Sequence, residues 1–364
     1  MSFPRIDRLA HAMQSSGFDA YFAQTPVSLG YLAGFPEDSH ERFMTLAIHA
    51  DGRHRLICPS LSAAQARRAG ISDIASWADG EDPLALFAAL AEEWGLRNSI
   101  LAVDDHLPAA MLLGMQATLP AALFKAGQGV LAMVRSVKDA EELAAMRAAA
   151  KIADETYLEV LPQIRVGQTE LEVETLLRDG MRKRGGNPTF CIVGVGAGSA
   201  EPHHLNGETK VAAGEVLLMD FGCEYLGYQS DITRCVSVGA ASAEAKEVYN
   251  IVLRAHHAAR AAILPGAAGS DIDAAARQVI VQAGYGDQFF HRTGHGIGME
   301  GHEAPNMVAG NDVPLQPGNC FSVEPGIYLE GKFGIRIENI LYSTETGHES
   351  FNDEPADHLM EIPI

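Results

Sequence analysis

Four acidic residues lie in or beside apolar, strand-like segments of the second half of the chain, and they constrain the fold more than any other feature. The apolar segments are residues 216–219 and 335–340, and the acids are Asp220, Asp231, Glu324 and Glu338. Semi-buried carboxylates destabilise a fold severely unless cations lie among them. The sequence therefore predicts a fold that brings cations to these four positions.

The spacing of the acids predicts two hairpins. Asp220 and Asp231 are eleven residues apart around 223–228, and Glu324 and Glu338 are fourteen apart around 331–334. In antiparallel pairs whose loops are centred there, we expect the two members of each pair to lie opposite each other on one face, with Cβ atoms about 5 Å apart. Segments 217–222 and 320–326 also share a pattern, an apolar strand followed by a carboxylate and a glycine.

A histidine completes the candidate set. His295 lies in the motif Thr-Gly-His-Gly-Ile-Gly at 293–298, whose glycines disfavour a helix and allow close backbone approach. Four carboxylates and one imidazole, without a thiolate, suit Mn or Co, with Zn possible, in a two-metal centre. The alternative is that the acids face solvent or pair with Arg234 and Arg336, which explains one acid more readily than two matched pairs.

The pattern of helices and strands predicts two domains, residues 1–134 and 135–364. The first alternates helices and strands, with a two-residue turn signal at Asp51-Gly52, and reads as α/β. The second groups long helices, at about 139–160, 169–184, 243–264 and 270–284, apart from its strands, and reads as α+β with antiparallel hairpins. The uncharged stretch 107–124 carries two prolines and polar residues, so we expect one or two helices of a soluble domain there.

Charge and cysteine content exclude several classes of partner. The chain has 364 residues, with 27 Lys and Arg against 47 Asp and Glu, a formal net charge of -20. Such a surface repels nucleic acid and anionic membranes. The five cysteines are scattered and include no Cys-x-x-Cys pair, and the amino terminus shows no apolar targeting segment. We expect a cytoplasmic protein.

The segments Tyr31-Leu-Ala-Gly-Phe, Arg292-Thr-Gly-His-Gly-Ile-Gly and Gly334-Ile-Arg-Ile-Glu-Asn carry a resemblance that spans the whole chain. They resemble the pita-bread metallopeptidases, in the branch of aminopeptidase P, prolidase and creatinase. The resemblance implies a creatinase-like α/β amino-terminal domain, an α+β pita-bread catalytic domain at the carboxy terminus, and a homodimer.

The resemblance also implies roles for individual residues. It implies two divalent metal ions, Mn first, bridged by two of the acids, with the ligands Asp220, Asp231 (bridging), His295, Glu324 and Glu338 (bridging). It places His203 near the reacting carbonyl of the substrate. It implies that His302 hydrogen-bonds the substrate and stabilises the tetrahedral intermediate. His291 resembles a histidine of the proline-specific branch, and Arg336 an arginine that orients a carboxylate or the substrate. Glu324 is the candidate for carrying the proton to the leaving nitrogen.

The implied activity is hydrolysis of the Xaa-Pro bond at the amino terminus of di- or oligopeptides, by attack of a hydroxide that bridges the metals. Several prolidases carry an arginine directly after the His-Glu-x-Pro motif, where this chain has Asn306. Dipeptides and longer peptides therefore both remain open as substrates, and Arg336 is the first candidate to replace the missing cation. The alternatives are a metal-free creatinase-like amidine hydrolase and a non-catalytic peptide-binding module.

A glycine-rich segment at Gly194-x-Gly-x-Gly198 follows an apolar run, as in dinucleotide-binding proteins. The residues after it, Ser-Ala-Glu-Pro-His-His, do not suit the helix that such a site requires. We interpret the segment as a loop bordering the substrate pocket.

Overall fold

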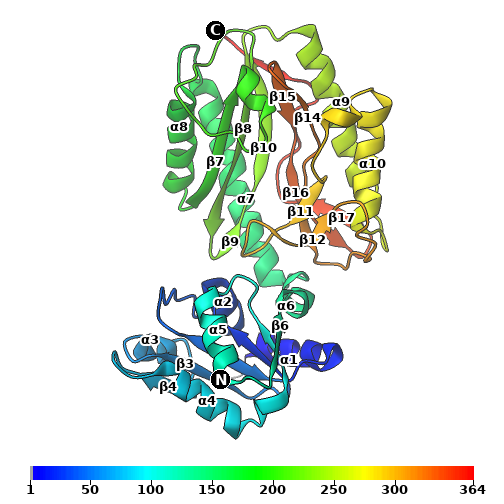
Figure 1. The fold of residues 1–364 in the computed structure, drawn as a ribbon. Helices are drawn as coiled ribbons and strands as arrows, with labels where there is room; N and C mark the ends of the chain where they lie inside the picture. The colour runs from blue at the N-terminus through cyan, green and yellow to red at the C-terminus, as the bar shows by residue number, and fades with distance from the viewer. Residues whose placement is uncertain (1–2) are drawn as a thin grey trace. The chain divides into compact units, whose positions relative to one another are not determined.

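The computed structural model describes residues 3–364, which form two compact units that meet between Arg135 and Ser136 (Figure 1). The boundary falls one residue after the one expected from the sequence. None of the helices in residues 3–364 has the length and apolar character needed to cross a bilayer.

The first unit is built on a mixed six-stranded sheet of order β4-β3-β2-β1-β5-β6. Its strands are β1 Ala20–Ala23, β2 Thr45–His49, β3 His54–Pro59, β4 Ile74–Trp77, β5 Ile100–Val103 and β6 Leu123–Ala126. Its helices are α1 Pro4–Ser16, α2 Pro26–Ala33, α3 Ala63–Arg68, α4 Pro83–Glu93, α5 Ala109–Thr118 and α6 Gln128–Arg135, with a short 3-10 turn η1 at Leu96–Asn98. This unit is α/β, as the sequence predicts.

Two local predictions in the first unit agree with the structure. The Asp51-Gly52 turn joins β2 to β3, and Gly52 takes the positive φ of 92° that such a turn requires. The uncharged stretch 107–124 was expected to contain one or two helices of a soluble domain. It contains one helix, α5, and its last two residues begin β6, an edge strand that pairs in parallel with β5.

The second unit contains four long helices and twelve strands among its residues. The helices are α7 Ala140–Val160, α8 Glu170–Lys183, α9 Ala243–Ala261 and α10 Gly269–Gln282, with 3-10 turns η2 Leu161–Gln163, η3 Gly196–Ala200 and η4 Gly286–Gln288. The strands of the first half are β7 Asn187–Val195, β8 Val216–Tyr225, β9 Tyr228–Gln229 and β10 Ile232–Val238. Those that follow are β11 Gly294–Gly296, β12 Glu303–Met307, β13 Cys320–Val323, β14 Gly326–Leu329, β15 Phe333–Arg336, β16 Asn339–Thr344, β17 Gly347–Ser350 and β18 Met360–Ile362.

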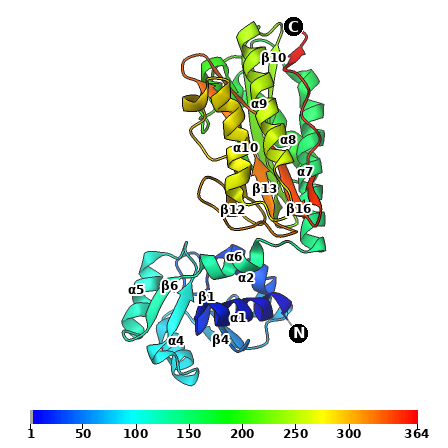
Figure 2. The ribbon, with the colours of Figure 1, turned by 90° about the vertical axis from the view of Figure 1, so that its right-hand side faces the viewer.

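The four helices cover the outside of three sheets, which are β18-β10-β8-β7 with β9, β12-β11-β13-β16-β17, and β14-β15 (Figures 1 and 2). Helices α7 and α8 pack on the sheet β18-β10-β8-β7, whereas α9 and α10 pack on the strands from β12 to β15. Each helix pair shares an apolar core with its own strands. The sheets are antiparallel except for the β10–β18 pair, which is parallel, so the predicted α+β class of this unit is confirmed.

The register of the first hairpin differs from the predicted one. Leu226 and Gly227 form its turn, both with positive φ, of 52° and 82°. This turn is centred one residue later than the sequence suggested, so Asp220 lies opposite Thr233 and not opposite Asp231. A shift of two positions keeps side chains on the same face, because the side-chain period of a strand is two. The two aspartates are therefore diagonal neighbours on one face.

The second pair of acids follows the predicted register. The last pair of the β13–β16 ladder is Val323 with Asn339, and the first pair of the β14–β15 ladder is Gly326 with Arg336. Both ladders share one register, and Glu324 and Glu338 fall opposite each other in the gap between them. The carboxylates thus lie where the pairing between two strands is interrupted.

The glycine-rich segment borders the pocket only through its continuation: Pro202 and His203 line the cavity described below, whereas the glycines at 194–198 are not among its lining residues. A Cβ on Gly194 would come within 2.8 Å of Ser199 Cα, and one on Gly334 within 2.1 Å of Ser199 O. The backbone of Gly334 in β15 donates to Ser199 Oγ at 2.8 Å. The glycines let η3 fold back tightly and pack on β15.

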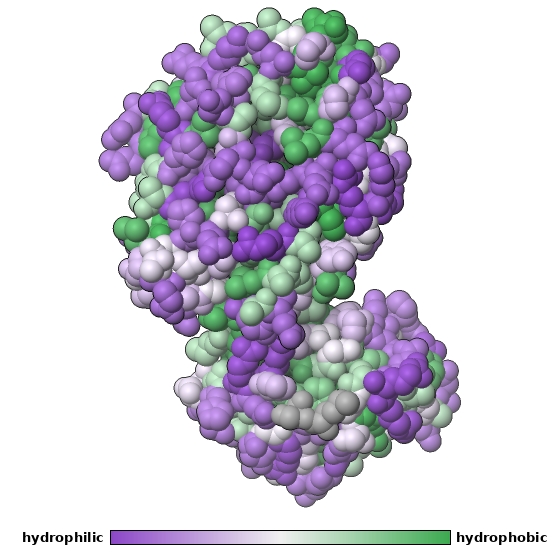
Figure 3. All heavy atoms as spheres, turned by 180° about the vertical axis from the view of Figure 1, so that it is seen from behind, coloured by the Kyte–Doolittle hydropathy of each residue, from purple (hydrophilic) through white to green (hydrophobic). Residues whose placement is uncertain are grey.

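The face visible in Figure 3 is a mosaic in which hydrophilic residues predominate and hydrophobic residues occur in small groups.

Candidate metal centre and active site

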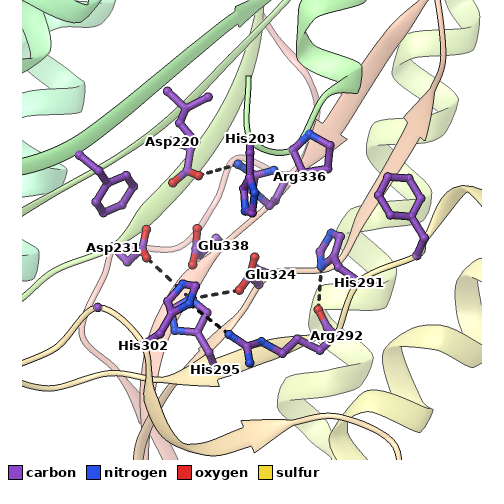
Figure 4. Close-up of a pocket in the computed structure, with 15 residues that line it drawn as sticks. His203, Asp220, Asp231, His291, Arg292, His295, His302, Glu324, Arg336 and Glu338 are labelled. Atoms are coloured by element: carbon purple, nitrogen blue, oxygen red, sulfur yellow. Dashed lines mark hydrogen bonds and ion pairs between the residues drawn. The ribbon is translucent and has the colours of Figure 1, made fainter. Parts of the chain in front are cut away.

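One cavity of the second unit, of about 770 Å³, contains all the residues for which the sequence suggests a chemical role (Figure 4). It is lined by Phe190, Ile192, Pro202, His203, Asp220, Asp231, Phe290, His291, Arg292, His295, Gly301, His302, Glu324, Arg336 and Glu338. The five predicted metal ligands come from β8, β11, the start of β10 and the gap between the β13–β16 and β14–β15 ladders. The structure therefore brings together residues that are more than a hundred positions apart.

The carboxylates and the imidazole converge on a small volume. One ligand atom each from Asp231, His295 and Glu338 lie within 4.8 Å of one another, and all three residues are buried. The Nε2 atom of His295 is 3.2 Å from Glu324 Oε1 and 3.8 Å from Asp231 Oδ2. Figure 4 shows these side chains pointing toward a common space.

The protonation of His295 suits metal binding. Its Nδ1 lies 3.1 Å from the carbonyl oxygen of Gly296, to which it donates when protonated. Burial lowers the pKa of His295 to about 4, so the ring is neutral at neutral pH. With the proton on Nδ1, the lone pair of Nε2 faces the carboxylates, as in metal-bound histidines.

The acids are under strong mutual repulsion in the absence of a cation. Burial, together with the neighbouring acids, raises the pKa of Asp231 and of Glu338 well above the usual range. Burial raises the pKa of Glu324 as well. Among residues 3–364, the buried atoms Asp220 Oδ1 and Asp231 Oδ1 have no hydrogen-bond partner. Unpaired buried oxygens of this kind fit divalent cations as their missing partners.

Arg336 orients the carboxylates from behind. Its Nη2 donates to Asp220 Oδ2 at 2.5 Å, and its Nε donates to Thr233 Oγ1 at 3.0 Å. Thr233 in turn donates to Glu338 Oε2 at 2.6 Å. The third nitrogen, Nη1, donates to Tyr328 Oη at 2.9 Å. Each nitrogen of this buried guanidinium is thus held by the protein.

The three remaining predicted histidines occupy different positions. His302 lies against His295, with ring centroids 3.9 Å apart, and its pKa is lowered to about 4 by burial and then by repulsion from His295 in that ring's protonated form. His291 faces Tyr328 Oη with Nε2, at 2.9 Å, and the Arg292 carbonyl with Nδ1, at 2.7 Å. His203 lines the cavity yet is exposed, so it stands at the mouth.

Sequence reasoning missed Arg292, although it lies in the quoted motif. Its Nη1 donates to Asn306 Oδ1 at 2.8 Å, and its Nη2 lies 3.3 Å from His302 Nδ1. In the described part of the chain Arg292 pairs with no carboxylate, so its charge is available to the cavity. Its proximity to His295 in the sequence was a signal that it reaches the pocket. Thr233, two residues after Asp231 on the same strand face, could have been found in the same way.

Comparisons with known proteins agree with this fold and site. Residues 144–345 match metallopeptidase family M24, and residues 5–137 match the creatinase/prolidase N-terminal domain. The chain therefore belongs to metallopeptidase family M24 and has the pita-bread catalytic domain of that family.

Individual relatives are similar over their full length. An Xaa-Pro dipeptidase of Lactobacillus delbrueckii subsp. lactis is 35% identical, with 99% of each chain covered. The crystal structure of dipeptidase PepE from Mycobacterium ulcerans superposes with a TM-score of 0.93 at 36% identity, covering 99% of this chain and 98% of that one. A prolidase from Thermococcus sibiricus superposes with a TM-score of 0.93 at 31% identity, with both chains fully covered.

Proposed function

We propose that this protein is a dinuclear metal-dependent peptidase that hydrolyses the Xaa-Pro bond of dipeptides. The observation that carries the proposal is the convergence of three buried carboxylates, a fourth that is partly buried, and a neutral imidazole, with two carboxylate oxygens left unpaired in the described chain. The names of the relatives support the substrate class. The complete set of acids favours this activity over metal-free amidine hydrolysis and over passive peptide binding.

The proposed ligands are those that the sequence suggests: Asp220, Asp231, His295, Glu324 and Glu338. Mn is our first choice of metal, because oxygen-rich sites with one imidazole suit it. When bound here, divalent ions supply Lewis-acid polarisation of the scissile carbonyl and lower the pKa of water. Arg336 and Thr233 hold two of the carboxylates in place while this happens.

The histidines and Glu324 serve the reacting atoms. Since Arg292 Nη2 donates to Nδ1 of the neutral His302, we assign the ring proton to Nε2, which then donates to the developing oxyanion. His203 donates from the mouth of the cavity. Ser322 Oγ donates to Glu324 Oε1 at 3.0 Å, which leaves Oε2 to carry a proton to the departing nitrogen.

The overall test compares substrates and metal states. Protein freed of metal by a chelator is expected to be inactive, and Mn, Co or Zn is expected to restore hydrolysis of Ala-Pro but not of Ala-Ala. Hydrolysis of Ala-Pro at the full rate by protein shown to be metal-free by elemental analysis would contradict the proposal.

Arg292 is our candidate for reading the free carboxylate of a dipeptide. The neutral Asn306 left both dipeptides and longer peptides open as substrates. Arg292 lies beside Asn306, whose side-chain oxygen accepts a hydrogen bond from Arg292 Nη1 and orients it. Arg336, the first candidate from the sequence, is buried, and each of its nitrogens is engaged by protein atoms. A guanidinium that lines the cavity and pairs with no acid can bind a carboxylate in bidentate geometry.

The prediction for Arg292 concerns selectivity. Arg292→Gln is expected to reduce kcat/KM for Ala-Pro by about 10- to 100-fold, because charge-assisted hydrogen bonds contribute about 1.5–3 kcal/mol. Ala-Pro amide and Ala-Pro-Ala lack the carboxylate at this position, so their kcat/KM should fall only by the share that comes from the lost contact to His302, which is common to all three substrates. Arg292→Lys, which keeps the charge, is the control and should retain part of the preference. If the ratio of kcat/KM for Ala-Pro to kcat/KM for Ala-Pro amide were the same in Arg292→Gln as in the wild type, another cation would bind the substrate carboxylate.

We further propose a cytoplasmic homodimer. All five cysteines are free and buried, which suits a reducing compartment. Sedimentation equilibrium of the metal-loaded protein tests the dimer, and a monomer at micromolar concentration would contradict it.

A further inference from the structure

The loop that carries His203 is fastened at one buried carboxylate. Residues 196–207 connect β7 to the segment before β8, and they contribute Pro202 and His203 to the cavity. In the described chain the side chain of His203 makes no hydrogen bond of its own. Its position over the carboxylates, visible in Figure 4, therefore depends on how the loop is held.

Glu170, the first residue of α8, holds both ends of this loop. Its carboxylate is fully buried and accepts three hydrogen bonds. Oε1 accepts from the backbone N of Val195 at 3.0 Å, and Oε2 accepts from the backbone N of Gly207 at 2.9 Å. The third bond, also to Oε2, comes from Nε2 of His204 at 3.0 Å.

The glycine-rich segment makes room for this contact. A Cβ at Gly198 would lie 2.9 Å from Cε1 of His204 and 3.3 Å from Oε1 of Glu170. Only a glycine leaves space for the imidazole to reach the carboxylate. The last glycine of the motif thus serves the packing of His204.

The surroundings of His204 favour a charged ring. Nε2 faces Glu170 and Nδ1 faces Glu201 Oε2 at 3.2 Å, so both nitrogens point to carboxylates. Both contacts are hydrogen bonds only when both nitrogens carry protons. Burial opposes the charge, but the hydrogen bonds that the ring donates to Glu170 on α8 and to Glu201 on the loop raise the pKa of His204 above its usual range. These two acids are the ionisable groups that face the ring.

We propose that Glu170 and His204 act as a positioning pair that sets the location of His203 in the active site, and that the pair is fully formed only while His204 is protonated. This proposal rests on the role given to His203 in the proposed function. The direction of the pH dependence follows from the raised pKa of His204. A histidine whose pKa is raised by folding contributes its stabilisation at low pH, and the contribution is lost as pH rises through the folded pKa. Turnover should therefore decline on the alkaline side as His204 loses its proton.

The test is a double-mutant cycle in the Mn-loaded enzyme. His204→Gln keeps one hydrogen bond to Glu170 but cannot titrate. We expect kcat for Ala-Pro to fall about 10-fold, since small misplacements of a reacting group are costly, with KM nearly unchanged and the alkaline decline removed. In a His203→Ala background the same change should have no further effect. His358→Gln, at an exposed histidine that also contacts an acid, is the matched control and should leave the profile unchanged.

Two outcomes overturn the proposal and leave the proposed function standing. One is that the reductions in kcat caused by His204→Gln and by His203→Ala multiply in the double variant, while the wild type remains an Mn-dependent Xaa-Pro peptidase. The other does not need a folded variant: histidine-selective NMR titration of the wild type would show His204 titrating below about 6.5, the ordinary value. A titration midpoint above that value that coincides with the alkaline decline of kcat is the result we expect.

Discussion

Replacement of Asp231 by Asn is expected to reduce kcat/KM for Ala-Pro by about 10³-fold or more. Asp231 lies within 4.8 Å of both His295 and Glu338, and its Oδ1 is buried without a partner in the described chain. A carboxylate in this position can serve two ions, whereas an amide offers one neutral oxygen. Loss of Lewis-acid stabilisation is worth several kcal/mol, and each 1.36 kcal/mol changes the rate tenfold. Metal content measured together with kinetics should fall by more than one ion per chain.

The same variant should be stabilised when no metal is present. Burial and neighbouring acids raise the pKa values of Asp231, Glu324 and Glu338, so the metal-free fold loses stability as pH rises from acid through these folded pKa values. Asp231→Asn removes one of the repelling charges. Its metal-free melting temperature at pH 7 should exceed that of the metal-free wild type, by about 2–4 °C for each kcal/mol.

The control for this experiment is Glu345→Gln, which changes an exposed carboxylate outside the cavity. It should alter neither metal content nor melting temperature. Retention of two tightly bound ions in Asp231→Asn would argue against a bridging role.

Replacement of His302 by Ala should lower kcat by about 10²- to 10³-fold and leave metal content unchanged. The neutral ring, locked by Arg292 at Nδ1, presents Nε2–H to the cavity. Removal of one pre-organised oxyanion donor costs about 2.7–4 kcal/mol. Because the pKa of His302 is about 4, activity should not show a titration of this residue between pH 5 and 8.

His302→Gln provides the comparison within the same site. The amide keeps a donor, so part of the lost kcat should return, with KM similar in both variants. Equal activity of the alanine variant and the wild type would assign His302 a packing role beside His295.

The second pair of acids shows how far sequence spacing reaches. Glu324 and Glu338 stand opposite each other, as predicted, because the turn is centred on Gly331, the first residue of the predicted 331–334 loop, which has a positive φ of 72°. The register of the first hairpin differs from the predicted one because its turn contains Leu226 in a left-handed conformation. Leucine is rare in such turns, which favour Asn or Asp before Gly. The face of the strand was nevertheless correct, because the error was two residues.

The long helices were the most predictable elements, and the contacts between distant side chains were the least. Helices α7 and α8 begin after Asp139 and Thr169, each with a capping box formed with a glutamate three residues on. By contrast, the use of Arg336 depends on Thr233 and Asp220, which lie on other strands. No spacing rule indicates that this arginine is fully engaged while Arg292 remains available.

The gap between the β13–β16 and β14–β15 ladders has a consequence for how this hairpin can change. The turn at Glu330–Lys332 sets which residues of the two strands lie opposite each other, and so it sets the positions of both Glu324 and Glu338. This turn is not among the residues that line the cavity. Insertion or deletion of a single residue there would slide one strand past the other and turn one carboxylate to the opposite face. The length of a solvent-facing turn is therefore as much a part of the metal centre as the acids themselves.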